Sequence, residues 1–182
     1  LLEGLLNRGV RAVRLGQPVK VREELREATL DAKMQTHPLR KDLEHEIGMI
    51  EKLRRRIKGM KGKEKGLAHR DLKNNWKIVR KYESQMRDEI LDRAQILCCT
   101  CIGSGHEILD GRRFSRVLID EATQATEPAS LVPISRGARQ IVLIGDHKQL
   151  PPTVISRRAE SGGLARSLFE RMVEMGVIPM LL

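Results

Sequence analysis

Residues 117–128 read VLIDEATQATEP, and residues 142–152 read VLIGDHKQLPP. Each stretch is an apolar run that ends in charged or polar side chains. These side chains are Asp120 and Glu121 after the first run, and Gly145, Asp146 and Gln149 after the second. In a parallel sheet the carboxyl ends of the strands meet at one edge, where ligands gather. The two stretches therefore predict a ligand site built from neighbouring strand ends.

This set of side chains fits the hydrolysis of a nucleoside triphosphate. Asp120 continues directly from its strand and suits a Mg²⁺ ligand acting through a water, while Glu121 suits a general base that polarises the attacking water. Asp146 could order the water on the metal, and Gln149 could hydrogen-bond the γ-phosphate. The alternative is an ordinary turn or helix cap after each strand. The joint occurrence of both stretches favours the hydrolytic site.

Composition indicates the kind of partner. The chain has 182 residues, 40% of them hydrophobic, which is enough for one domain with a buried core. Its net charge of +10 favours a polyanion, most simply nucleic acid. Aromatic residues make up only 2%, too few for a base-stacking platform, so contacts should use phosphate and ribose without reading the sequence. No apolar run has membrane-spanning length and no signal peptide is visible. We expect an intracellular protein, cytoplasmic or nuclear, on the basis of the cysteines described below.

Two stripes of apolar residues at steps of three and four predict two long antiparallel helices. The first stripe is Leu39, Leu43, Ile47, Ile50, Leu53 and Ile57, and the second is Leu72, Trp76, Val79, Met86 and Ile90. Between them, residues 58–70 contain three glycines and a dense positive charge, which predicts a mobile basic loop. Residues 38–93 are therefore expected to form an inserted helical hairpin.

The flanking residues, 1–37 and 94–182, show the alternation of strands and helices that is typical of an α/β fold with a parallel sheet. The predicted strands are Val10–Leu15, Gln95–Cys99, Arg116–Ile119 and Gln140–Ile144, with the sheet resuming at Val177. Because the last runs are continuously apolar, we expect strands buried on both faces. The predicted helices are a charged surface segment over 19–36, a short helix from Pro128 to Gly137, and a helix marked by Leu164, Leu168, Met172 and Met175.

The three cysteines, Cys98, Cys99 and Cys101, lie in one strand-like segment, which fits a reducing compartment better than a disulfide framework. Cys98 and Cys101 have the C-x-x-C spacing of a half zinc site. A zinc site would need a second ligand pair, and His106 alone lies nearby. Small residues packed in a strand are the favoured interpretation.

The stretches DEATQATEP (120–128) and GDHKQLPP (145–152) resemble the second and third motifs of superfamily 1 helicases. More narrowly, they are similar to the branch that contains the helicase of nonsense-mediated mRNA decay, the immunoglobulin mu-binding helicase and senataxin. The segment ILCCTCIGSG (96–105) is similar to that branch's nucleic-acid-contacting motif, and GLARSLFERMVEMGV (163–177) to the helix after its third motif. The paired helices resemble its helical insertion, so the resemblance spans nearly the whole chain.

The resemblance implies a partial RecA-like (P-loop NTPase) domain with an inserted antiparallel helical hairpin. It implies an ATP-dependent helicase that moves on single-stranded RNA or DNA, with ATP and Mg²⁺ as cofactors. By position, Asp120 resembles the Mg²⁺ ligand, Glu121 the catalytic base and Gln149 the γ-phosphate sensor. Thr100 and Gly103 resemble contacts to the nucleic-acid backbone, and the loop that ends at Pro152 faces the nucleic acid.

Two parts of the helicase pattern do not occur within the 182 residues: the phosphate-cradling loop G-x-x-x-x-G-K-[ST], and the second RecA-like domain with its arginine finger. The stretch GMKGKEKG (59–66) differs from the loop because Lys63 is followed by Glu64 rather than Ser or Thr. We therefore expect these residues alone to bind ATP poorly and not to turn it over, and the parent protein to do both.

Two other functions stay open. The helical pair could be a nucleic-acid-binding module without ATPase activity, its charge carried by Lys58, Lys61, Lys63, Lys65 and Arg70, although such runs are usually solvated faces. Alternatively, the long charged helices could dock a protein partner.

Overall fold

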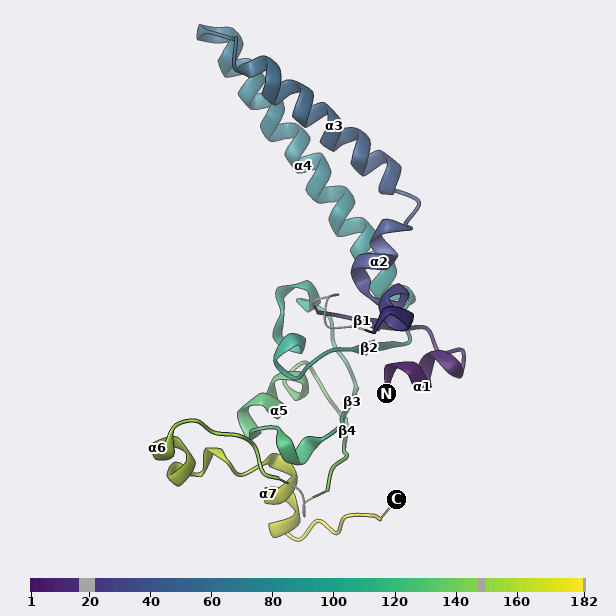
Figure 1. The fold of residues 1–182 in the computed structure, drawn as a ribbon, viewed down its shortest axis with the longest axis vertical. Helices are drawn as coiled ribbons and strands as arrows, with labels where there is room; N and C mark the ends of the chain where they lie inside the picture. The colour runs from purple at the N-terminus through teal and green to yellow at the C-terminus, as the bar shows by residue number, and fades with distance from the viewer. Residues whose placement is uncertain (17–21, 147–149, 182) are drawn as a thin grey trace. The chain divides into compact units, whose positions relative to one another are not determined.

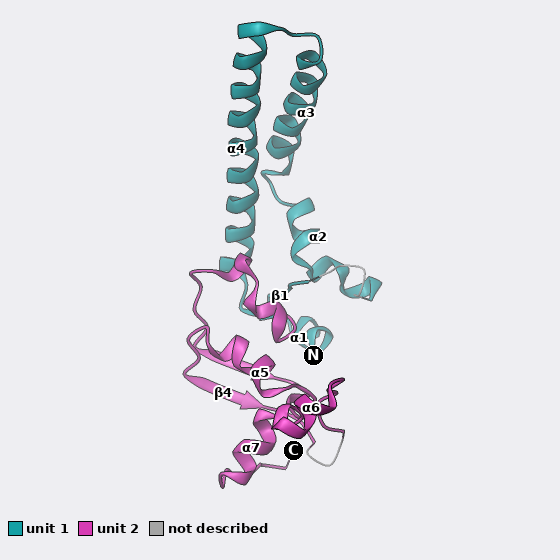
Figure 2. Ribbon diagram, turned by 90° about the vertical axis from the view of Figure 1, so that its left-hand side faces the viewer, with its two compact units in different colours: residues 1–98 teal, residues 99–182 magenta. Residues whose placement is uncertain are grey.

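The computed structural model describes residues 1–16, 22–146 and 150–181. It divides into two compact units, residues 1–98 and residues 99–182 (Figure 2). Unit 1 contains α1 (Leu2–Asn7), β1 (Ala12–Arg14), the 3₁₀ helix η2 (Glu23–Ala28), α2 (Leu30–Gln35), α3 (Arg40–Ile57), α4 (Gly62–Arg93) and β2 (Ile96–Cys98). Unit 2 contains the 3₁₀ helices η3 (Ile102–Gly105), η4 (Glu107–Leu109) and η5 (Ala122–Gln124), the strands β3 (Arg116–Ile119) and β4 (Gln140–Leu143), the helices α5 (Glu127–Ile134), α6 (Arg157–Ala159) and α7 (Leu168–Glu174), and the π-helical turn η6 (Glu160–Leu164).

The α/β fold with parallel strands is confirmed, and the strands form two separate two-stranded sheets. In unit 1, β1 pairs with β2 in parallel, with Val13 opposite Leu97. Thr29, which is 1% exposed, caps α2 by accepting a hydrogen bond from the Ala32 amide. The whole hairpin is inserted between β1 and β2, two strands that are neighbours in the sheet.

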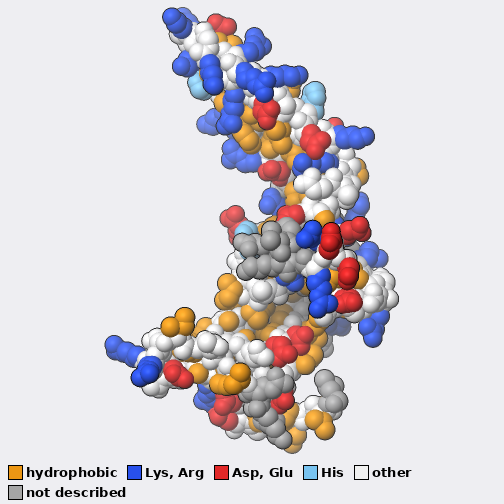
Figure 3. Space-filling model, viewed as in Figure 1, with side chains coloured by type: hydrophobic (Ala, Val, Ile, Leu, Met, Phe, Trp, Pro, Cys, Tyr) orange, Lys and Arg blue, Asp and Glu red, His pale blue; other side chains and the backbone are white. Residues whose placement is uncertain are grey.

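The predicted helical hairpin is confirmed. Helices α3 and α4 lie side by side (Figure 1), and their apolar stripes meet in a core whose fully buried members are Leu43, Ile50, Val79 and Met86. Trp76 packs against this core, and the Arg54 guanidinium lies 5.7 Å from the centre of its ring. Lysine and arginine gather over the hairpin in Figure 3, and the hairpin is held mainly by this narrow apolar seam.

The predicted loop over residues 58–70 is mostly wrong. Helix α3 ends at Ile57 and α4 already begins at Gly62, so the connection is short. Ala68, inside the predicted loop, is 5% exposed. Burial of this side chain on the continuing stripe, together with the helix propensity of its lysine, glutamate and leucine neighbours, outweighs the cost of two glycines.

In unit 2, β3 pairs with β4 in parallel, with Ile119 opposite Leu143. Ile119 and Ala122 pack with Phe169 of α7 in the core of this unit. The prediction that these strands are buried on both faces is wrong, because Leu118, Ile141 and Val142 are 51%, 45% and 51% exposed. Leu118 and Val142 are paired on the face that the described residues leave exposed, while Ile141 lies on the face of Ile119 and Leu143, which the core covers only in part.

Helix α5 follows the prediction, with Pro128 in its first turn and Gly137 beyond its end. Helix α7 is shorter than predicted. Ser167 caps its start by accepting a hydrogen bond from the Glu170 amide, and Leu164 belongs instead to the π-helical turn η6, in which Gly163 has a φ of 92°. The strand predicted from Val177 is wrong, since the described residues 177–181 form no strand and find no strand partner. None of the described helices is long and apolar enough to cross a membrane.

A buried histidine anchors the start of the hairpin. His37, between α2 and α3, accepts a hydrogen bond from the Leu39 amide at Nδ1, and its Nε2 lies 3.3 Å from a carboxylate oxygen of Glu89 on α4. A hydrogen bond from Gln85 lowers the pKa of Glu89, and the nearby His37 and Arg93 lower it further. The charged form of Glu89 therefore stabilises the folded hairpin.

We predict that Met86→Ala destabilises the hairpin by about 2–5 kcal/mol, because Met86 is fully buried and the truncation leaves a cavity. Met49→Ala is the matched control: Met49 is 45% exposed, and its change should stay within about 0.5 kcal/mol. Urea unfolding followed by the fluorescence of Trp76, the single tryptophan, measures both. Equal losses for the two variants would contradict the assignment of the core.

We predict that Glu89→Gln destabilises the hairpin at neutral pH and that the difference from the wild type disappears in acid. The pKa of Glu89 is lowered in the folded chain, so its contribution is present above the ordinary value of 4.5 and is lost as the pH falls through the folded value. Trp76 fluorescence unfolding at about pH 7 and about pH 3 tests this, with Glu51→Gln on the exposed face of α3 as control. A difference that persists unchanged at low pH would contradict it.

Candidate functional site

The carboxyl ends of β3 and β4 meet at one edge of their sheet. The Ile144 amide donates to the Ile119 carbonyl at 2.9 Å, and the Ala122 amide donates to the Ile144 carbonyl at 2.7 Å. These two bonds continue the pairing past the last residues of the strands. Asp120 and Asp146, the acidic residues after the two strands, are both exposed there. The structure thus brings together the strand ends that the sequence predicted to converge.

Glu121 has an unusual backbone conformation, with φ 54° and ψ 41°. Among the described residues it is the one non-glycine residue with a positive φ. A side chain in this left-handed region costs on the order of 1–3 kcal/mol and persists only where the surroundings impose it. The imposing contacts are the bond from Ala122 to Ile144 and one from the Gln124 amide to the Glu121 carbonyl. Strain of this kind is common at functional sites.

Hydrogen bonds orient the acidic pair. The Glu121 amide donates to Asp120 Oδ1 at 3.2 Å, and Gln124 Nε2 donates to Glu121 Oε2 at 3.2 Å. Both carboxylates are exposed, so they can reach a ligand or water at this edge. The sequence interpretation did not single out Gln124. Its spacing of three residues from Glu121, within one tight turn, was the available signal.

Gly145 is the point of closest approach between the two strand ends. A Cβ at this position would lie 3.0 Å from both Cγ2 and Oγ1 of Thr123 and 3.1 Å from the Thr123 amide nitrogen. Contacts this short mean that Thr123 would have to shift by a few tenths of an ångström to admit any larger side chain, so the turn after β4 favours glycine. Thr123 is itself 5% exposed, and its hydroxyl has no hydrogen-bond partner among the described residues. The sequence interpretation also missed Thr123. Its importance lies in its close contact with Gly145, which only the folded structure shows.

Two of the residues singled out in the second stretch, His147 and Gln149, lie outside the described residues. Pro152 is buried, which does not favour a direct contact between its side chain and nucleic acid. The roles assigned to Gln149 and Pro152 stay predictions.

Thr100 and Gly103 form a tight turn in unit 2. The Gly103 amide donates to Thr100 Oγ1 at 3.0 Å, and a Cβ on Gly103 would lie 2.8 Å from that oxygen. Glycine is therefore required for the turn to close on the threonine hydroxyl. Thr100 is exposed and Gly103 half-buried, so hydroxyl and backbone groups, the usual donors to nucleic-acid phosphates, lie at the surface.

The cysteines behave as packing residues. Cys98 packs against the core of unit 1 and Cys101 against the core of unit 2. Burial raises the pKa of both thiols, so less of the reactive thiolate forms at neutral pH. None of the three cysteines, all of which the structure describes, forms a disulfide. Packing supports the interpretation of Cys98 and Cys101 as small core residues.

The acidic edge fits a Mg²⁺ ion that arrives with a nucleotide. Over residues 1–16, 22–146 and 150–181, no three or more histidine, cysteine, aspartate or glutamate side chains cluster as a metal cage. Magnesium is usually held by one or two carboxylates together with water and substrate phosphates. The exposed carboxylates of Asp120 and Glu121 at the end of β3 leave room for such water and phosphate ligands, which a closed cage would exclude.

The family model and the most similar known proteins point to the same family. Residues 1–157 match the sequence model of the AAA domain family. The chain is 49% identical over 113 residues to ATP-dependent helicase NAM7 of Saccharomyces cerevisiae, which is 62% of the chain and 11% of that protein. It is 35% identical over 173 residues to Regulator of nonsense transcripts 1 of Dictyostelium discoideum, covering 94% of the chain and 12% of that protein.

A third relative is DNA polymerase alpha-associated DNA helicase A of Schizosaccharomyces pombe, 31% identical over 177 residues, which is 96% of the chain and 26% of that protein. The chain thus spans between 11% and 26% of the length of these curated relatives. The resemblance stated from the two motifs is confirmed by these matches. The chain belongs to the AAA domain family, within the superfamily 1 helicase branch of these relatives.

Proposed function

We propose that this chain is part of an ATP-dependent helicase that couples ATP hydrolysis to movement on single-stranded nucleic acid. The observation that carries the proposal is the joined edge of β3 and β4, where Asp120, the strained Glu121 and the Gly145–Asp146 turn lie together. Two of the relatives are named as an ATP-dependent helicase and a DNA helicase, which supports the same function.

Within this proposal, Asp120 holds the Mg²⁺ ion through a water, and the ion neutralises charge on the triphosphate when it is bound. Glu121 accepts a proton from the attacking water, and its left-handed backbone together with the bond from Gln124 fixes the direction of its carboxylate. Asp146 orders water at the same edge, and Gln149 hydrogen-bonds the γ-phosphate.

The nucleic-acid partner is single-stranded RNA or DNA, contacted without sequence readout. Thr100 and Gly103 present the hydroxyl and backbone groups of their turn to the phosphate backbone. The net charge of +10 and the scarcity of aromatic residues support contacts to phosphate rather than to bases. The three cysteines lie in one short segment and form no disulfide, which supports an intracellular location.

A second candidate is a nucleic-acid-binding role for the hairpin itself. The cations near its tip, Lys58, Lys61, Lys63, Lys65 and Arg70, are all exposed, and Figure 3 shows lysine and arginine gathered over the hairpin. Neutralising them should flatten the slope of log affinity against log salt if the tip contacts phosphates. An unchanged slope would leave these residues a solvated face.

We predict that Glu121→Gln in the full-length protein lowers the rate of ATP hydrolysis by about 10²–10⁴-fold, because the amide cannot accept the proton of the attacking water. ATP affinity should change little, since the amide keeps the size of the side chain. Phosphate release and the binding of a fluorescent ATP analogue measure the two effects. Glu160→Gln, at an exposed carboxylate of η6, is the matched control. Normal turnover in the Glu121 variant would remove its assignment as the base.

A further inference from the structure

The turn that carries Thr100 and Gly103 is closed by Ser104, a buried residue of the 3₁₀ helix η3. The Ser104 amide donates to the Thr100 carbonyl at 3.0 Å, and the Ser104 hydroxyl donates to the Cys101 carbonyl at 2.5 Å. Ser104 is 6% exposed, so these bonds are shielded from water. A group that fixes Ser104 therefore also fixes the groups that the turn presents at the surface.

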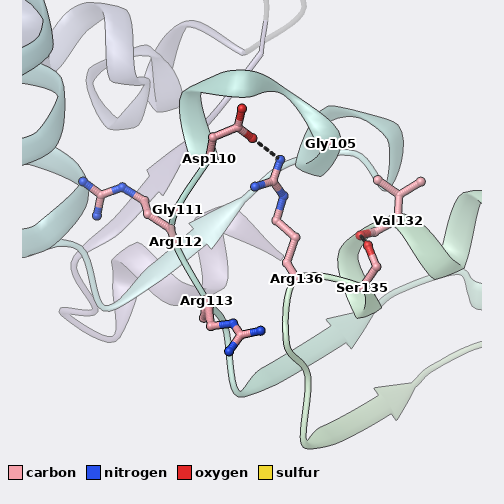
Figure 4. Close-up of a pocket in the computed structure, with 8 residues that line it drawn as sticks. All are labelled: Gly105, Asp110, Gly111, Arg112, Arg113, Val132, Ser135 and Arg136. Carbon is pink, nitrogen blue, oxygen red and sulfur yellow. Dashed lines mark hydrogen bonds and ion pairs between the residues drawn. The ribbon is translucent and has the colours of Figure 1, made fainter.

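Arg136, just beyond the end of α5, binds the segment that begins at Ser104. Its guanidinium donates to three backbone carbonyls, those of Ser104 at 2.6 Å, Leu109 at 2.7 Å and His106 at 3.1 Å. It also pairs with Asp110 at 3.2 Å, as Figure 4 shows. A planar guanidinium with fixed N–H directions suits several acceptors at once. Arg136 therefore ties together the whole loop from Ser104 to Asp110.

Two further contacts hold η3 against α5. A Cβ on Gly105 would lie 3.0 Å from Val132 Cγ1, so η3 packs closely on α5 at this glycine. The Arg136 carbonyl accepts a hydrogen bond from the Phe114 amide at 3.1 Å, which joins its backbone to the segment that leads into β3. Since both its backbone and its guanidinium are bonded, Arg136 is a rigid support for η3 rather than a mobile surface cation.

The charge of Arg136 is directed into the protein. Its side chain is 15% exposed, and all three guanidinium nitrogens donate to protein oxygens. Asp110 supplies the opposite charge. An arginine that binds a nucleic-acid phosphate directly needs N–H groups that face the phosphate. The geometry therefore favours an indirect role, exerted through the backbone that Arg136 holds.

We propose that Arg136 is a positioning residue for nucleic-acid binding. It holds Ser104, and through Ser104 it holds the turn in which Thr100 and Gly103 meet the strand. A loop that is ordered before binding loses less conformational entropy when the strand arrives, so the affinity is higher. This inference rests on the proposed nucleic-acid-dependent function and adds a residue outside the helicase motifs.

The test is Arg136→Gln in the full-length protein, with a short oligouridylate titrated to saturation over a series of salt concentrations. The Kd should rise about 5- to 30-fold, because the turn must then be ordered when the strand binds. The slope of log affinity against log salt should stay unchanged, because no phosphate contact is lost. Arg136→Lys keeps the charge but lacks the planar fork, so its Kd should rise as well.

Two further variants separate the backbone bonds from the charge. Asp110→Asn keeps the three bonds from Arg136 to the carbonyls, and its Kd should stay within about 2-fold of the wild type, since the carboxylate is 70% exposed. A double-mutant cycle of Arg136→Gln with Thr100→Val shows whether Arg136 acts through the turn. Because both changes then affect one contact, their combined loss should be smaller than the sum of the single losses.

An unchanged Kd in both Arg136 variants overturns the inference. A slope reduced by about 0.7 also overturns it, because Arg136 would then be a direct phosphate contact. A smaller fraction of binding-competent protein with an unchanged Kd would leave Arg136 a purely structural residue, and losses additive with those of Thr100→Val would place its effect elsewhere.

Each of these results overturns the inference and leaves the proposed function intact. Should Arg136→Gln fail to fold, Arg136→Lys decides by the same criteria. Wild-type protein that neither binds oligouridylate nor hydrolyses ATP overturns the proposed function and the inference together.

Discussion

The bond from the Ala122 amide to the Ile144 carbonyl joins the ends of two neighbouring strands, and the candidate site depends on it. This bond holds the turn in which Glu121 adopts its left-handed backbone, at a cost on the order of 1–3 kcal/mol. It also draws the turn after β4 so close to Thr123 that a Cβ at position 145 would push against Thr123. A short sheet can thus hold two acidic turns at one edge, where a bound cation would offset the negative charge of the carboxylates.

The fold was predictable wherever apolar residues recurred with one helical spacing over many residues. The stripes of α3 and α4 place Leu43, Ile50, Val79 and Met86 in one seam, and a helical period read over long helices leaves little ambiguity. The basic connection was predicted too long because its glycines and lysines favour a loop locally, whereas burial of Ala68 extends the helix. The predicted strand at Val177 failed for a related reason. An apolar run becomes a strand only where a partner strand accepts its hydrogen bonds.

The candidate site was predictable in its acidic residues and not in what supports them. Asp120, Glu121 and Asp146 follow apolar runs, so their position at strand ends could be read from the sequence. The close approach of Gly145 to Thr123 joins residues from different strands, and a single sequence carries no sign of it. The same is true of Arg136, whose partners are mainly backbone carbonyls of a distant loop, because carbonyls are present at every residue.

The central claim is that Asp120 and Asp146 serve one metal–nucleotide site across two strand ends. A double-mutant cycle with Asp120→Asn and Asp146→Asn in the full-length protein tests it most directly, with Mg²⁺-dependent ATP hydrolysis as the readout. Groups that act on one bound ligand couple by roughly 0.5–3 kcal/mol, so the double variant should lose less than the sum of the two single losses. Strictly additive losses would mean that the two carboxylates act independently and would contradict a shared site.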